Sequence, residues 1–133
     1  MRIGLLAWVV SLAACTGASD SEPDQVPAGN WGGEHVALEV TAAGGQAEFD
    51  CAHATIAEAL RLRDGRFDVT GVYVREHGGP AQEGEPEDRH PARFAGTLRG
   101  NRLSFSVGLT DEDETIGSFT VVRGAPPRVF KCL

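Results

Sequence analysis

Apolar and polar residues alternate with a period of two along most of the chain that follows Trp31. The alternation covers four runs, at residues 36–41, 67–73, 93–99 and 103–108. Because successive side chains of a strand point to opposite faces of a sheet, this pattern predicts β-strands with one buried face. The chain is therefore expected to be all-β.

Turn signals separate these runs, notably "AAGG" at 42–45, "RDG" at 63–65 and "RGN" at 99–101. Short connections make such a meander antiparallel, and closing it removes the exposed edges. We therefore expect about eight strands in a small up-and-down β-barrel, or in a flattened form of one. The predicted strands span residues 35–41, 46–52, 54–62, 66–74, 92–99, 102–109, 115–123 and 128–132.

Segment 54–62 leaves an alternative open. Its sequence, "ATIAEALRL", is rich in Ala, Glu and Leu, which favour a helix. The segment is short, and the "RDGRF" turn that follows it suits a hairpin. A strand is the expectation, and a helix is the alternative.

The N-terminus has the features of an export signal. Arg2 precedes a twelve-residue, largely apolar run that ends in "LAAC", at residues 12–15. The run is too short to span a bilayer of about 30 Å but matches the apolar core of a signal peptide. The "LAAC" stretch resembles the lipobox of bacterial lipoproteins, which implies cleavage before Cys15 and its acylation with palmitate-type chains. The alternative is an ordinary secretory signal near which Cys15 falls by chance.

The signal peptide is thus assigned to residues 1–14, and a single β-barrel domain to residues 31–133. Between them, residues 15–30 comprise the lipidated cysteine and an acidic tether with almost nothing to bury. The predicted location is the bacterial cell envelope. If the cell is Gram-negative, Thr16 after the lipidated cysteine favours the outer membrane. The formal charge of −7 argues against a nucleic-acid partner, because the arginines are scattered singly except for a loose cluster at Arg61, Arg63 and Arg66.

Two further cysteines, Cys51 and Cys132, remain for a disulfide outside the cytosol; two free thiols are the alternative. If Gly44 and Gly45 form the first hairpin turn, then Leu38 lies opposite Cys51, and Val36 lies opposite His53. Cys51 would then point inward, and a disulfide would cross the core between opposed walls. An inward-facing thiol with a raised pKa, about 7 Å from His53, argues against a catalytic pair.

The candidate binding surface combines one barrel end with the long polar loop predicted over residues 75–93. Loops of this length are usually functional or mobile. The residues assigned to this surface are Trp31, His35, His53, Arg75, Glu76 and His77. The alternative is a metal site formed by His35 and His53 with His77 or His90, although no HxH or HxxxH spacing supports it. No catalytic residue, metal or cofactor is assigned.

The stretches "WGGEH", "FDCAH", "GRFDVTGVYVREHGGP" and "KCL" together resemble a group of short uncharacterised bacterial lipoproteins. The resemblance covers nearly the whole region from Trp31 to Leu133. That group has no assigned activity, so the resemblance implies an envelope location and transfers no catalytic residues.

The leading hypothesis is a non-enzymatic, lipid-anchored envelope domain that binds a small ligand or a protein partner. The alternative is a metal-binding or metal-dependent hydrolytic envelope protein that uses His35, His53 and His77. A passive structural lipoprotein is a third possibility.

The anchor makes a direct prediction. Substituting Cys15→Ser should move the protein from the membrane fraction to the soluble fraction, because the acylated residue is lost and two or more acyl chains are needed for stable anchoring. Cell fractionation followed by immunoblotting measures this. Unchanged membrane association would show that Cys15 is not the anchor.

Overall fold

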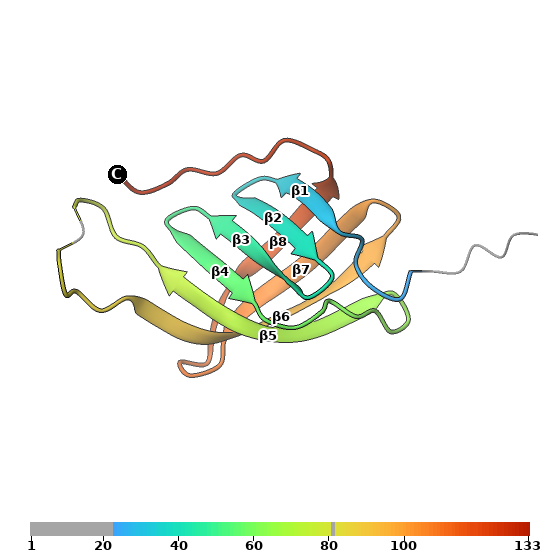
Figure 1. The fold of residues 1–133 in the computed structure, drawn as a ribbon, viewed down its shortest axis with the longest axis horizontal. Coiled ribbons are helices and arrows are strands. Elements are labelled where there is room, and N and C mark those ends of the chain that lie inside the picture. The colour runs from blue at the N-terminus through green and yellow to red at the C-terminus, as the bar shows by residue number, and fades with distance from the viewer. Residues whose placement is uncertain (1–22, 81) are drawn as a thin grey trace, which may run out of the picture.

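The computed structural model describes residues 23–80 and 82–133. Eight antiparallel strands follow one another around a closed barrel in sequence order (Figure 1). The strands are β1 (Gly29–Gly33), β2 (Val36–Thr41), β3 (Gly44–Phe49), β4 (Ala52–Ile56), β5 (Arg66–Arg75), β6 (Asp88–Arg99), β7 (Arg102–Leu109) and β8 (Glu114–Arg123). The all-β class, the antiparallel meander and the barrel are therefore confirmed. Within the described residues, no helix is long and apolar enough to cross a membrane.

The barrel begins earlier in the chain than the sequence pattern indicated. Residues 24–30 were assigned to the tether, but β1 starts at Gly29 and Val26 is only 3% exposed. The Val26 N–H donates to the Leu60 carbonyl over 2.9 Å, which fixes the entering chain to the barrel. The predicted signal peptide and Cys15 lie outside the described residues.

The predicted register of the first long hairpin was wrong by four residues. The turn is Ala42–Ala43, so Leu38 pairs with Ala47 and not with Cys51. The shift is even, so the side chains within β2 and β3 keep their predicted faces, which is why Phe49 is buried as expected. Cys51 lies in the β3–β4 turn with a φ of 54°, so it does not point into the core.

The position predicted for His53 was also wrong, because the Asp50–Cys51 turn separates His53 from β3. His53 follows Ala52 in β4 and pairs with Val74 of β5, not with Val36. Its neighbours Ala52 and Ala54 are both buried, so His53 is on the outer face and half-buried.

Segment 54–62 is neither a full strand nor a helix. Strand β4 ends at Ile56, and residues 57–65 cross the end of the barrel as an irregular loop. Leu60 of this loop is 1% exposed and belongs to the core cluster. The helix-forming residues are overridden because Leu60 covers the open barrel end.

The barrel interior is filled by side chains. Phe49 packs against Tyr73 and Phe119, with ring centroids 5.6 Å and 4.8 Å apart, and Phe119 also contacts Phe105. Trp31 is 2% exposed, and its indole N–H donates to the Pro27 carbonyl over 3.0 Å. The core is therefore a packed apolar cluster of the kind that fills small eight-stranded barrels.

The barrel closes through a short seam. Strands β1 and β8 share only two residue pairs, Trp31 with Arg123 and Gly32 with Val122. The chain then turns back over β1, where a Cβ on Gly32 would lie 2.1 Å from the Ala125 carbonyl oxygen. Glycine is needed there because the backbone passes too close for any side chain.

After β8 the chain continues as a C-terminal strap, residues 124–133, which runs along the outside of the barrel (Figure 1). The prediction of a strand at 128–132 was therefore wrong. Arg128 exchanges two backbone hydrogen bonds with the β1–β2 connection, donating to the Gly33 carbonyl and accepting from the His35 N–H. The strap ends beside the β5–β6 loop, where Gly79 N–H donates to the Leu133 carbonyl over 3.0 Å.

The disulfide joins Cys51 to Cys132, with Cα atoms 4.9 Å apart, so the predicted pairing is confirmed. It does not cross the core as expected. It links the β3–β4 turn to the strap on the outside of the barrel, because both cysteines lie outside the strands.

Replacing both cysteines, Cys51→Ala and Cys132→Ala, should lower the free energy of unfolding by about 4.5 kcal/mol. The disulfide closes a loop across a sequence separation of 81, which restricts the unfolded chain. Urea unfolding of the oxidised wild type and the double variant measures the difference, with reduced wild type as a control. An unchanged unfolding midpoint would contradict a stabilising role.

Candidate functional site

The two ends of the barrel differ in charge. The loop end is formed by the connections at 34–35, 50–51, 75–89 and 110–114, together with the strap. It carries eleven acidic residues against four Arg and Lys residues. The arginine end is formed by residues 24–28, 42–43, 57–66, 99–102 and Arg123, and carries six arginines against three acids.

The loop end contains a groove of about 400 Å³ between strand β5 and the loop that follows it. Four of the six residues predicted for the binding surface line it, namely His53, Arg75, Glu76 and His77. The other polar residues of its lining are Gln82, Glu85, Glu87 and Asp88. The structure therefore brings together residues that are 35 positions apart in sequence.

The remaining two predicted residues do not line this groove. Trp31 lies inside the barrel at 2% exposure, so it belongs to the core and not to a ligand surface. His35 is exposed in the β1–β2 turn, where its Nδ1 lies 2.6 Å from Asp50 Oδ2. The other oxygen of Asp50 accepts a hydrogen bond from the Phe130 N–H over 2.8 Å, which lowers the Asp50 pKa together with His35.

Lys131 of the strap is the central cation of the loop end. Its ammonium group donates to the Ala52 and Phe49 carbonyls over 2.8 Å and 3.2 Å. It also pairs with Glu48 at 2.6 Å and with Glu76 at 3.0 Å. Partial burial alone lowers the Lys131 pKa, but its carboxylate partners outweigh burial and raise it.

Glu76 connects Lys131 to His53. One oxygen, Oε2, lies 2.7 Å from His53 Nδ1 and 3.0 Å from Lys131 Nζ. Burial raises the Glu76 pKa, while the hydrogen bonds from His53 and Lys131 lower it by more. Glu76 is therefore an ionised residue that holds the strap against the barrel. This role of Glu76 could not be predicted from a local sequence pattern, because Lys131 is 55 positions away.

The histidines are each paired with different carboxylates. His35 contacts Asp50 and His53 contacts Glu76, while His77 lies 3.1 Å from Glu85 through Nε2. In the part of the chain that the structure describes, no three metal-binding side chains gather into a cluster suited to an ion. The geometry therefore lends no support to a site formed by His35, His53 and His77.

Arg75 and His90 tie the β5–β6 hairpin to the β7–β8 connection. Arg75 pairs with Glu114 at 2.6 Å and with Glu112 at 3.4 Å. His90 has only 9% of its side chain exposed and lies between Asp88 at 2.6 Å and Asp111 at 2.9 Å. Hydrogen bonds to these two carboxylates raise the His90 pKa, because each favours a protonated ring nitrogen.

The strap adds apolar surface to this end. Phe130 is 59% exposed and Leu133 is fully exposed. The Leu133 carbonyl is bonded to Gly79, which lines the groove, so the strap terminus lies beside it. The loop end therefore combines an acidic groove with exposed apolar side chains.

Comparison with known proteins adds no assignment. No protein-family model, curated protein or solved structure matches this chain.

His90 predicts a pH-dependent stability. Because its folded-state pKa is raised, its charged contacts stabilise the protein fully below pH 6.5, and this contribution is lost as the pH rises through the folded-state value. His90→Asn should therefore reduce the free energy of unfolding more at pH 5.5 than at pH 8.5. Urea unfolding at both pH values measures this.

Asp111→Asn is the matched variant, since it removes one of the two carboxylates that contact His90. It should weaken the same pH dependence. An equal loss at pH 5.5 and pH 8.5 for His90→Asn would contradict the charged arrangement.

Proposed function

We propose that the protein is a non-enzymatic, lipid-anchored binding domain of the cell envelope, and that it binds a protein partner through its loop end. The observation that carries this proposal is that one barrel end combines the acidic groove with the exposed side chains of Phe130 and Leu133. A filled core favours a ligand on the outer surface over one inside the barrel.

The negative charge of the groove indicates what charge a partner segment should carry. Its lining has four carboxylates, and its one arginine, Arg75, is already paired with Glu112 and Glu114. Glu76 is likewise engaged by His53 and Lys131. Glu85, Glu87 and Asp88 each contact one cationic side chain as well, but their carboxylates are 41%, 56% and 56% exposed, so they can also face a partner, which favours a basic segment.

The apolar part of the surface supports a protein over a small ion as the partner. Aromatic side chains are enriched in the central regions of protein interfaces. The backbone of Phe130 is held in place because its N–H donates to Asp50 and the disulfide ties the strap to the barrel. An exposed phenyl ring at the same barrel end as an acidic groove suits a partner segment that combines basic and apolar residues.

The hydrogen bonds that the side chains in and beside the groove already make favour binding over catalysis. Glu76 is bonded to both His53 and Lys131, and Lys131 also donates to the Ala52 carbonyl of the barrel. Their contacts hold the strap in place, which is a structural task. The predicted anchor at Cys15 supplies the envelope location in this proposal.

Photo-crosslinking in cells tests the surface. A crosslinking amino acid at Phe130 or at Glu85 should give a discrete adduct with one envelope protein, whereas the same residue at Glu39, on the outer face near the other barrel end, should not. Combining the Phe130 probe with Glu87→Lys should lower the yield about fivefold, because a reversed charge faces the basic segment.

Glu39→Lys is the matched control for the charge reversal, since both are exposed single acids. It should leave the Phe130 adduct unchanged. Adducts of equal yield from Glu39 and Phe130, or no adduct from either loop-end position, would contradict the proposed surface.

A further inference from the structure

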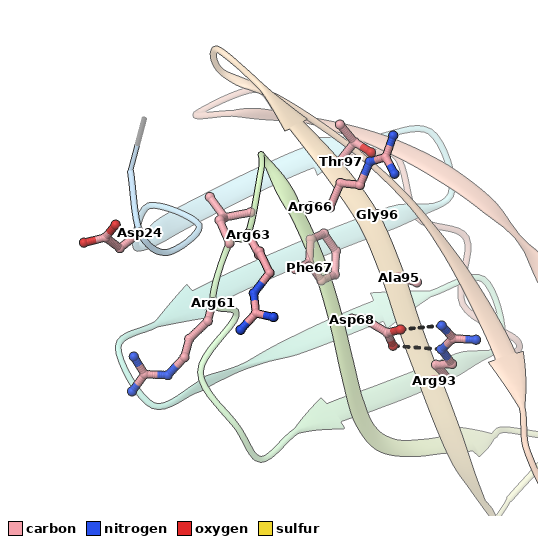
Figure 2. Close-up of a pocket in the computed structure, with 11 residues that line it drawn as sticks. Asp24, Arg61, Arg63, Arg66, Phe67, Asp68, Arg93, Ala95, Gly96 and Thr97 are labelled. Carbon is pink, nitrogen blue, oxygen red and sulfur yellow. Dashed lines mark hydrogen bonds and ion pairs between the residues drawn. The ribbon is translucent and has the colours of Figure 1, made fainter. Parts of the chain in front are cut away.

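The arginine end contains a second groove, of about 970 Å³, over the outer face of β5 and β6 (Figure 2). Its floor is formed by the small residues Ala95, Gly96 and Thr97, and loop 57–65 forms one wall. Four arginines line it, namely Arg61, Arg63, Arg66 and Arg93. The only acids in its lining are Asp24 and Asp68.

Three of these arginines have no side-chain partner within residues 23–80 and 82–133. The Arg93 guanidinium group donates two hydrogen bonds to the Asp68 carboxylate, as the dashed lines in Figure 2 show. Among the described residues, Arg61, Arg63 and Arg66 form no side-chain ion pair or hydrogen bond, and all three are exposed. Their positions are nevertheless constrained, because the backbones of Arg63 and Arg66 exchange two hydrogen bonds of 2.8 Å and 3.0 Å.

This arrangement contrasts with the rest of the protein. Every arginine and lysine of the loop end is paired with a carboxylate. Free guanidinium groups around a groove of small residues are suited to phosphate, which arginine binds through two parallel N–H donors.

The chain enters the barrel at this same end. Asp24 lines the groove, and its carbonyl accepts a hydrogen bond from the Leu62 N–H over 2.8 Å. Cys15 precedes Asp24 by nine residues, which span at most about 32 Å when fully extended. An anchor at Cys15 therefore keeps the arginine end close to the lipid surface.

We propose that the arginine end rests on the membrane, and that its groove binds the phosphate groups of anionic lipids. This inference extends the proposed function, since the anchor at Cys15 is what holds the groove near the lipid. The acidic loop end lies at the opposite end of the barrel, beyond the Debye length of about 8 Å, so its repulsion from the membrane is screened.

Binding to vesicles tests the inference without the anchor. The lipid-free chain of residues 16–133 retains every core residue and both disulfide cysteines, which lie between Val26 and Cys132. It should sediment with vesicles of phosphatidylglycerol and phosphatidylcholine, should lose binding as salt increases, and should not sediment with pure phosphatidylcholine. Asp20 and Glu22 are kept in this chain, so their opposing charge is included.

Two charge-matched double variants locate the contact. Arg63→Ala with Arg66→Ala should weaken binding to the anionic vesicles about 30-fold, because each arginine near such a surface contributes about fivefold. Arg89→Ala with Arg128→Ala removes the same charge from the loop end and should change binding by less than about twofold. Thermal unfolding checks that both variants remain folded.

Three outcomes would overturn the inference. The first is equal binding to neutral and anionic vesicles, and the second is an equal loss of vesicle binding in the two double variants. The third is release of the protein from anionic vesicles by 10 mM inorganic phosphate at constant ionic strength. The last would identify a site for soluble phosphate in place of a lipid. Because this chain lacks Cys15, failure of the arginine contact is measured separately from failure of the anchor, which the Cys15→Ser variant tests in the full chain.

Discussion

The fold depends on how a short seam is closed. An eight-stranded barrel needs its first and last strands to pair, yet β1 and β8 share only two residue pairs. The strap compensates by crossing β1 and continuing past the turns of the loop end. It is held by backbone bonds at Arg128, by Lys131 and by the disulfide to Cys51. Closure is thus secured by the ten residues that follow the last strand, more than by the ladder itself.

The same strap builds the candidate site. Glu76 and His53, which line the acidic groove, are also the residues that bind Lys131 or support it. Substituting either one would disturb the strap and the groove together, so loss of binding alone would not separate the two roles. Glu85, Glu87 and Phe130 are better probes, because they contribute charge or apolar surface without a contact to Lys131.

The sequence predicted the barrel because alternation is a property of each strand and survives errors of register. The sequence pattern did not locate the turns in which a residue other than glycine adopts a positive φ. The turns at Glu34–His35 and Asp50–Cys51 place His35 and Cys51 at positive φ, a conformation that glycine adopts more readily. Glycine pairs suggested turns elsewhere, at 44–45, yet Gly44 lies in β3, where a Cβ would be 2.1 Å from the Ile56 carbonyl oxygen. Four of the residues predicted for the binding surface line one groove because they cluster around one loop, whereas Lys131 was not predicted because a contact 55 positions away leaves no local pattern.

The path of the chain explains why the point of entry and the acidic groove lie at opposite ends of the barrel. Alternate connections of an up-and-down barrel lie at opposite ends, so the loop end and the entry of the chain are separated by the length of the strands. The chain enters beside the free arginines, and the acidic groove lies beyond the far ends of β4 and β5. If the anchor and the arginine contact are both correct, the membrane fixes one end and the groove faces away from it. The charge asymmetry would then orient the domain, and the strap would present Phe130 where a partner in the aqueous phase can reach it.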